Sequence, residues 1–190
     1  VLLSVLFSLL CVSLHSKTVI HAGNLFNSNN GSIEPEMTIF IEDEKITDVI
    51  EGYVNPEIDD TYLDLTGYFV LPGLIDMHVH LTNLSSNKAY LERVTLNPAD
   101  YAIRATKNAE NTLNAGFTTV RNLGDSNSIT ISLRNAINNG IVIGPRIFSS
   151  GQTISSTGGH GDSTNSLNQQ LTRDLGPKDG VINSETDAFK

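Results

Sequence analysis

The chain has 190 residues, 39% of them hydrophobic, which is enough for one or two folded domains with a buried core. Its 12 Lys and Arg residues against 21 Asp and Glu residues give a formal net charge of −9, which argues against a nucleic-acid groove and against an anionic membrane surface as partner. The only cysteine is Cys11, so the chain can form no internal disulfide.

The chain begins with an apolar run from Val1 to Leu14. A membrane-spanning helix needs about 20 apolar residues, so this run is too short to span and is typical of the apolar region of a secretory signal peptide. We therefore expect residues 1–16 to be a signal peptide truncated at its start, and the mature protein to be secreted or periplasmic. A buried strand or helix is the alternative, against which the lack of any period in the apolar residues argues.

Residues 17–71 show short strand patterns separated by turns. KTVIHAGNLF is followed by the turn-rich NSNNGS, and the β-branched runs of MTIFIEDEKITDVIEG flank a polar turn from Glu42 to Lys45. TYLDLTGYFVL adds further strand pattern, interrupted at Gly67. The region is predicted to be a small antiparallel β-sandwich segment, with His21 as a core or edge histidine.

From Pro72 onward, strand patterns alternate with helix patterns. GLIDMHVHL, FTTVRNL and GPRIFSSG are the predicted strands. One helix is predicted between Asn97, an N-cap residue, and Gly116, and a second helix ends at Gly140. This order indicates an α/β fold with right-handed βαβ units and a parallel sheet.

Two histidines, His78 and His80, stand at the carboxyl end of the first of these strands, where parallel sheets carry their chemistry. Side chains two residues apart on a strand point to the same face, so both imidazoles face one way and Val79 the other. Two neutral imidazoles placed in this way can chelate one divalent metal. Asp76 is either a second-shell partner of this pair or simply a polar strand residue. An H-x-H alone is a weak signal, because a half-buried strand can carry it by chance.

The stretches GYFVLPGLIDMHVHL, NAGFTTVRNLGD and GPRIFSSGQTISSTGGHGD span most of the chain from Gly67 to Asp162. They resemble the metal-dependent amidohydrolase superfamily, most closely its branch of imidazolonepropionase-related enzymes and Xaa-Pro-type dipeptidases. The resemblance implies a (β/α)8 TIM barrel with one or two zinc ions at its carboxyl-terminal mouth, where a metal-bound hydroxide attacks an amide carbon. It also implies that His78 and His80 ligate the more buried metal.

The resemblance further implies a lysine, two more histidines and a proton-shuttling aspartate on later strands, all expected beyond Lys190. A complete barrel typically needs about 250 residues, more than this chain has. The chain is therefore predicted to be an N-terminal fragment, with residues 17–71 as the sandwich segment and residues 72–190 as the first βα units of the barrel. Histidine ligation favours zinc, although manganese, iron or cobalt fit a similar site.

Two residues are candidates for substrate binding. The glycine-rich STGGHGD follows the third strand and resembles a family segment that would present His160 to the pocket, the alternative being a flexible turn with a solvated histidine. Arg121 either binds a substrate carboxylate or pairs with Asp125 as a structural bridge. Relatives often carry Asp where this chain has Asn122, which puts an acidic role at that position in doubt.

We expect a metal-dependent hydrolase that cleaves an amide C–N bond of a dipeptide or an N-acyl amino acid with a metal-activated water. The alternatives are an amidohydrolase that acts on a cyclic amide, and a non-catalytic binding or structural module built on a partial barrel. The expected partner is a small-molecule or dipeptide substrate, with no nucleic acid and no stable membrane span, and a homo-oligomer is left open.

Overall fold

The computed structural model describes residues 16–83, 87–165 and 167–189. The chain divides into two compact units, Val1–Pro72 and Gly73–Lys190. The apolar run assigned to a signal peptide, with Cys11 inside it, lies outside the described residues. Within the described ranges, no helix is both long and apolar enough to cross a membrane.

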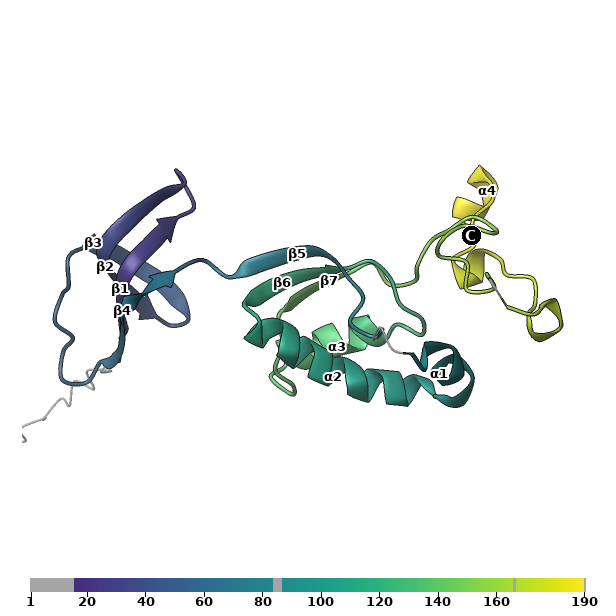
Figure 1. Ribbon diagram of the computed structural model, residues 1–190, viewed down its shortest axis with the longest axis horizontal. Helices are drawn as coiled ribbons and strands as arrows, with labels where there is room; N and C mark the ends of the chain where they lie inside the picture. Colours follow the sequence, from purple (N-terminus) through teal and green to yellow (C-terminus); the bar gives the residue numbers. More distant parts are fainter. Residues whose placement is uncertain (1–15, 84–86, 166, 190) are drawn as a thin grey trace, which may run out of the picture. The chain divides into compact units, whose positions relative to one another are not determined.

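The first unit contains one four-stranded sheet in the order β3-β2-β1-β4 (Figure 1). Its strands are β1 (Thr18–Asn27), β2 (Ser32–Glu42), β3 (Lys45–Glu51) and β4 (Thr61–Val70). The strands β2 and β3 pair antiparallel, and the two residues between them, Asp43 and Glu44, have φ values of 47° and 64°. Such a left-handed two-residue turn suits a tight hairpin, so the polar turn predicted from the sequence is confirmed.

The expectation of a wholly antiparallel segment is wrong, because β4 pairs parallel to β1. The described residues of this unit therefore form a single mixed sheet. The chain between β3 and β4 is too long for a tight hairpin, and it carries β4 to the far edge of β1, where the strand runs in the same direction as β1. Gly67 lies inside β4 and does not end the strand.

His21 is buried in this sheet, with 7% of its surface exposed. Its Nε2 lies 2.8 Å from the carbonyl oxygen of Val54, and its Nδ1 lies 3.0 Å from the Tyr62 hydroxyl. Its ring also stacks on Tyr53, with the ring centroids 4.8 Å apart. Both nitrogens are thus engaged, and of the two roles that the sequence left open for His21, core or edge histidine, the structure shows the core one.

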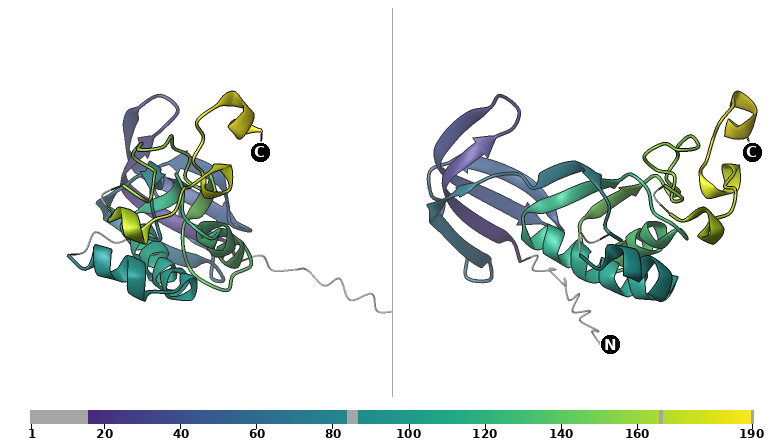
Figure 2. Two further views of the ribbon diagram at one scale, coloured as in Figure 1. Left: turned by 90° about the vertical axis from the view of Figure 1, so that its right-hand side faces the viewer. Right: turned by 45° about the vertical axis from the view of Figure 1, so that its right-hand side comes forward.

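The second unit is built on a three-stranded parallel sheet in the order β5-β6-β7. The strands are β5 (Leu74–Val79), β6 (Phe117–Asn122) and β7 (Arg146–Ser149). The two connecting helices, α2 (Pro98–Asn114) and α3 (Ile129–Asn138), lie on the same face of the sheet (Figures 1 and 2). The predicted alternation of strands and helices is confirmed, whereas a closed barrel is not formed by the described residues.

The core of this unit lies between the sheet and the two helices. Helix α2 begins after Asn97, whose backbone N–H donates to the Asp100 carboxylate at 2.8 Å. It buries Ala105 and Ala109, whose small side chains let the helix lie close to the sheet. The buried members of the core are Leu81, Ala105, Ala109, Val120, Ile129, Leu133 and Ile147.

The remaining elements of the second unit are short helices. Helix α1 (Ala89–Thr95) precedes α2 and was not predicted. After β7 come the 3-10 turns η1 (Gln169–Leu171) and η2 (Pro177–Asp179), and then α4 (Glu185–Ala188). The second unit is therefore α/β, with its parallel sheet in the first part and irregular structure after β7.

Candidate metal centre

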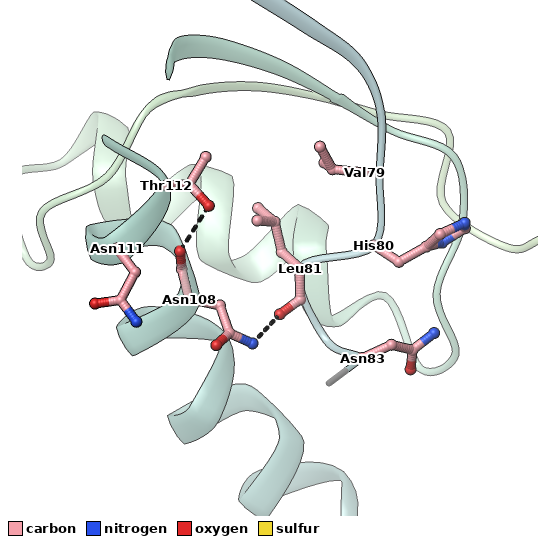
Figure 3. Close-up of a pocket in the computed structure, with 7 residues that line it drawn as sticks. All are labelled: Val79, His80, Leu81, Asn83, Asn108, Asn111 and Thr112. Atoms are coloured by element: carbon pink, nitrogen blue, oxygen red, sulfur yellow. Dashed lines mark hydrogen bonds between the residues drawn. The ribbon is translucent and has the colours of Figure 1, made fainter. Parts of the chain in front are cut away.

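The two histidines of the H-x-H motif come together at the carboxyl end of β5. The strand ends at Val79, whose side chain packs against the core between the sheet and the helices. His80 is the next residue. His78 and His80 flank Val79 and therefore face away from that core. Their ring centroids are 5.3 Å apart with an interplanar angle of 68°. Figure 3 shows the His80 ring directed away from α2, the helix that carries Asn108.

A hydrogen bond determines which nitrogen of His80 can act as a ligand. The Nδ1 atom of this half-buried ring lies 3.1 Å from the carbonyl oxygen of Gly124. Because a carbonyl oxygen only accepts, Nδ1 must carry the proton of the neutral ring. The Nε2 atom then keeps its lone pair, and a second-shell hydrogen bond of this kind is typical of metal-binding histidines.

Among the described residues, no hydrogen bond links Asp76 to either imidazole. Its carboxylate accepts a hydrogen bond of 3.0 Å from the backbone N–H of His78. Asp76 therefore supports the backbone at the end of β5, and the interpretation that it orients a histidine ring is not supported by these contacts.

The histidine pair fits a divalent cation as part of a ligand set. Neutral imidazole nitrogens suit zinc and other first-row transition metals. A catalytic zinc site typically uses three protein ligands. No group of three or more His, Cys, Asp or Glu side chains able to hold a metal occurs in the part of the chain that the structure describes. His78 and His80 could supply two of the donors that such a site needs.

Arg121 lies on the same face of the sheet as the histidine pair. In β6 it alternates with Val120 and Asn122, both of which are buried on the helix side. Its Nε–H donates to the carbonyl oxygen of Met77 in β5 at 2.9 Å, which holds the exposed guanidinium beside the site. The alternative of a bridge to Asp125 is wrong, because no such ion pair occurs among the described residues and Asp125 instead accepts from the backbone N–H of Thr130.

His160 is exposed on the glycine-rich loop that follows β7. Asp162, only 6% exposed, shapes this loop by accepting from the Thr164 hydroxyl at 2.6 Å, the Gly158 N–H at 2.8 Å and the Thr164 N–H at 2.9 Å. The hydrogen bond from the Thr164 hydroxyl, with those from the two backbone amides, lowers the pKa of Asp162. The loop is thus built around a carboxylate. His160 itself makes no hydrogen bond or ring contact within the described ranges.

The described residues of the second unit enclose hollows at two places of interest. One, of about 330 Å³, lies between the end of β5 and α2, on the helix side of the strand, and is lined by Val79, His80, Leu81, Asn83, Asn108, Asn111 and Thr112 (Figure 3). The other, of about 810 Å³, is polar and lies beside the Asp162 loop, with Thr164, Arg173 and Asp174 among its lining residues. His80 borders the first hollow although its ring is directed away from α2 (Figure 3), and His78 is not among the residues that line either hollow.

Sequence reasoning missed the structural importance of Asn122. This residue is fully buried at the end of β6, and its side-chain oxygen accepts from the backbone N–H of Leu81 at 2.9 Å. The available signal was its position two residues after Val120, which places a polar side chain on the buried face of a strand.

The second unit is an α/β fold of the kind found in amidohydrolase barrel proteins, with its histidine pair at the carboxyl edge of the sheet. The sequence profile of the amidohydrolase family matches residues 69–189, and the chain belongs to this family. A crystal structure of a Xaa-Pro dipeptidase with bound methionine in the active site superposes with a TM-score of 0.83 and 39% sequence identity, over 92% of this chain and 43% of that chain.

Two further relatives are hydrolases with other names. The ochratoxinase of Aspergillus niger is 29% identical over 153 residues, which cover 76% of this chain and 30% of that protein. The structure of a molinate hydrolase has a TM-score of 0.64 at 29% identity, over 75% of this chain and 31% of that chain. The chain thus spans less than half the length of each of these relatives.

Proposed function

We propose that this chain is part of a metal-dependent hydrolase that cleaves the amide C–N bond of a dipeptide or an N-acyl amino acid. In this proposal the residues from Gly73 onward are the first βα units of a (β/α)8 barrel. Membership of the amidohydrolase family and similarity to a Xaa-Pro dipeptidase support hydrolysis of an amide. The observation that carries the proposal is the pair of adjacent imidazoles at the end of β5, with the Nδ1 of His80 bonded to a backbone carbonyl.

Each candidate residue has a role in this proposal. The Nε2 atom of His80 and the ring of His78 hold a divalent cation, with zinc as the first choice. Such a cation, when bound, polarises a carbonyl and makes water a good nucleophile near neutral pH. The Arg121 guanidinium, on the same face, binds the carboxylate of the substrate. His160 contacts the substrate from the glycine-rich loop after β7. The hydrogen bonds of Asp162 restrict the conformations of this loop.

The substrate class in the proposal comes from two sources. Arg121 presents a fixed cation beside the metal ligands, which suits a substrate with a free carboxylate. The dipeptidase relative adds a terminal amino acid as the leaving group. Export to the periplasm or the medium is also part of the proposal and depends on the apolar run before Ser16.

The test compares metal content and turnover in the complete protein and three variants. In His78→Ala and His80→Ala we expect bound metal and hydrolysis of Xaa-Pro dipeptides and N-acyl amino acids to fall together, by ~100-fold or more, since even loss of a second-shell partner typically costs 10–100-fold. Val79→Ile is the matched control, because this side chain lies between the histidines but packs into the core. It should keep both properties.

Three results would count against the proposal. Unchanged turnover in a metal-free His78→Ala enzyme would remove the histidine pair from the mechanism. Metal binding without hydrolysis of any amide would favour a non-catalytic module. Hydrolysis limited to cyclic amides would leave the metal chemistry in place and replace the substrate class.

A further inference from the structure

The end of β6 carries a buried amide side chain that no step of the proposed mechanism uses. Asn122 is 0% exposed and lies opposite Val79 in the register of β5 and β6. A buried amide must find partners for its oxygen and its NH2 group, or the fold loses stability. The partners of Asn122 are therefore informative about what this residue does.

Asn122 joins β5 to its own strand end. Its Oδ1 accepts from the backbone N–H of Leu81 at 2.9 Å, which identifies the other end of the side chain as the NH2 group. That NH2 group donates to the carbonyl oxygen of Gly124 at 3.3 Å and lies 3.4 Å from the Thr130 hydroxyl. The side chain thus connects the residue that follows His80 with the loop that follows β6.

The carbonyl group of Gly124 is shared between Asn122 and His80. It receives the Nδ1–H of His80 at 3.1 Å and the NH2 of Asn122 at 3.3 Å. Gly124 has a φ of 128°, and an added Cβ would lie 2.1 Å from the Thr153 hydroxyl oxygen, so the backbone here has a conformation and a close contact that exclude a side chain. The carbonyl that orients the His80 ring is therefore held in place both by its own backbone and by Asn122.

We infer that Asn122 is a positioning residue for the metal ligand His80, which acts through the Gly124 carbonyl and the Leu81 amide. The inference rests on the proposed function, because it requires His80 to bind a metal. Asn122 fixes the backbone amide of Leu81, the residue after His80. It also fixes the Gly124 carbonyl, which accepts the hydrogen bond from the His80 ring. The imidazole is then held with Nδ1 protonated and Nε2 directed toward the cation.

In this chain, an amide at position 122 meets the needs of both neighbours. The backbone N–H of Leu81 needs an acceptor, and the Gly124 carbonyl oxygen faces a donor, so the side chain has to offer both. A carboxylate in the same place accepts from Leu81 but has no hydrogen to donate to Gly124. An aliphatic side chain leaves the Leu81 N–H and one lone pair of the Gly124 carbonyl without this partner.

The chain contains a matched control for this inference. Asn108, on α2, donates to the carbonyl oxygen of the same Leu81 at 2.7 Å (Figure 3), and no hydrogen bond between the described residues links it to Gly124. Asn108→Ala therefore loosens the same residue from the helix side and leaves the acceptor of His80 untouched. Thr130→Val is a second control, because it removes one partner of Asn122 and keeps the bonds to Leu81 and Gly124.

The experiment measures the dissociation constant of Zn²⁺ by competition with a chromophoric chelator, in the complete protein and its Asn122→Ala, Asn108→Ala, Thr130→Val and His80→Ala variants. Thermal unfolding of each metal-free variant is measured alongside. We expect a 10–100-fold weaker Zn²⁺ affinity in Asn122→Ala, the range typical of second-shell losses, and less than a threefold change in Asn108→Ala and Thr130→Val. If all three lower the unfolding temperature while Asn122→Ala alone weakens Zn²⁺ binding, the positioning role is supported.

Should Asn122→Ala fail to fold, Asn122→Asp replaces it, because it keeps the shape and the acceptor for Leu81. Its added negative charge attracts a cation, so the charge itself does not account for a weaker Zn²⁺ affinity in this variant, and loss of the donor to the Gly124 carbonyl does. Zn²⁺ affinity unchanged in Asn122→Ala, or lowered equally in Asn108→Ala, would overturn the inference and leave the proposed function standing. If His80→Ala binds Zn²⁺ as tightly as the wild type does, both the inference and the proposed function are overturned.

Discussion

The two buried or half-buried histidines, His21 and His80, differ by a single hydrogen bond, which decides whether a ring nitrogen keeps a lone pair available to a metal. In both rings one nitrogen lies next to a backbone carbonyl, that of Val54 and that of Gly124. In His21 the second nitrogen accepts from the Tyr62 hydroxyl, so its lone pair is used within the fold. In His80 the second nitrogen is Nε2, for which the described residues provide no hydrogen-bond partner. Only the latter arrangement leaves a lone pair for a cation.

The structural role of His21 leads to a prediction about stability. We expect His21→Phe, which keeps a ring against Tyr53, to lose both hydrogen bonds and leave the Val54 carbonyl without this donor, at a cost of about 2 kcal/mol in the free energy of unfolding. Tyr62→Phe removes only one of the two bonds and should cost about 1 kcal/mol. Urea unfolding followed by circular dichroism measures both values. Equal stability of the wild type and His21→Phe would show that the two hydrogen bonds contribute nothing net.

At this scale the sequence predicts what depends on spacing and misses what depends on packing. The H-x-H spacing is sufficient to place His78 and His80 on one face, and their rings are indeed adjacent. The carboxylate of Asp125 lies near Arg121 in sequence, yet it bonds to the start of α3 instead, because the loop after β6 turns it inward. The partners of Asn122 include Leu81, two residues after β5, and Thr130 in α3, and no local sequence pattern predicts such contacts.

Among the elements, those with strong end signals were predicted and those without them were not. Helix α2 has Asn97 and Pro98 at its start, and α3 ends just before Gly140. Helix α1 begins after Lys88, which makes no side-chain capping bond, and it buries no residue, so its sequence carries neither an N-cap nor a clear apolar face. The parallel pairing of β4 with β1 was missed because strand order between distant segments is not a local property.

The loop after β7 provides a prediction about pH. The pKa of Asp162 is lowered by the Thr164 hydroxyl and by two backbone amides. A carboxyl group whose pKa is lower in the folded loop stabilises that loop above its unfolded pKa of about 3.9, and this contribution is lost as the pH falls through the folded pKa. We therefore expect the Gly158 and Thr164 amides to be protected from hydrogen exchange at neutral pH and to lose protection only below about pH 4, after correction for intrinsic rates.

The same measurement on two variants tests the cause of this protection. Asp162→Asn removes the charge that strengthens all three hydrogen bonds, so the two amides should exchange faster at neutral pH and show little pH dependence. Asp174→Asn, an exposed aspartate of the same region, is the control and should leave both amides as in the wild type. Protection that is identical in Asp162→Asn and the wild type would mean that the glycine-rich loop does not depend on this carboxylate.

At the scale of the molecule, the described residues of the second unit cover the parallel sheet on one face only. Its helix-facing side chains, such as Val120 and Ile147, are buried. Large apolar side chains elsewhere on the sheet remain exposed, among them Ile75 at 61%, Met77 at 53% and Phe148 at 59%. Parallel sheets in α/β proteins are covered on both faces, and the nearly continuous apolar character of β5 fits that rule. Phe148 alternates with the buried Ile147 in β7, so this part of the exposed surface lies on the face away from the helices, which the proposed barrel would enclose.

The last prediction concerns the 190 residues produced as a separate polypeptide. Two imidazoles satisfy only part of the coordination of a divalent cation, and a catalytic zinc site typically uses three protein ligands. His78 is exposed, so water competes freely for the remaining positions. We expect this polypeptide to bind Zn²⁺ ~100-fold or more weakly than the complete protein and to hydrolyse none of the amide substrates. Equilibrium dialysis and turnover assays of the two proteins under the same conditions measure both properties. Turnover by the separate polypeptide that chelators abolish would show that the three strands already contain a sufficient site, and would disprove the need for ligands from further strands.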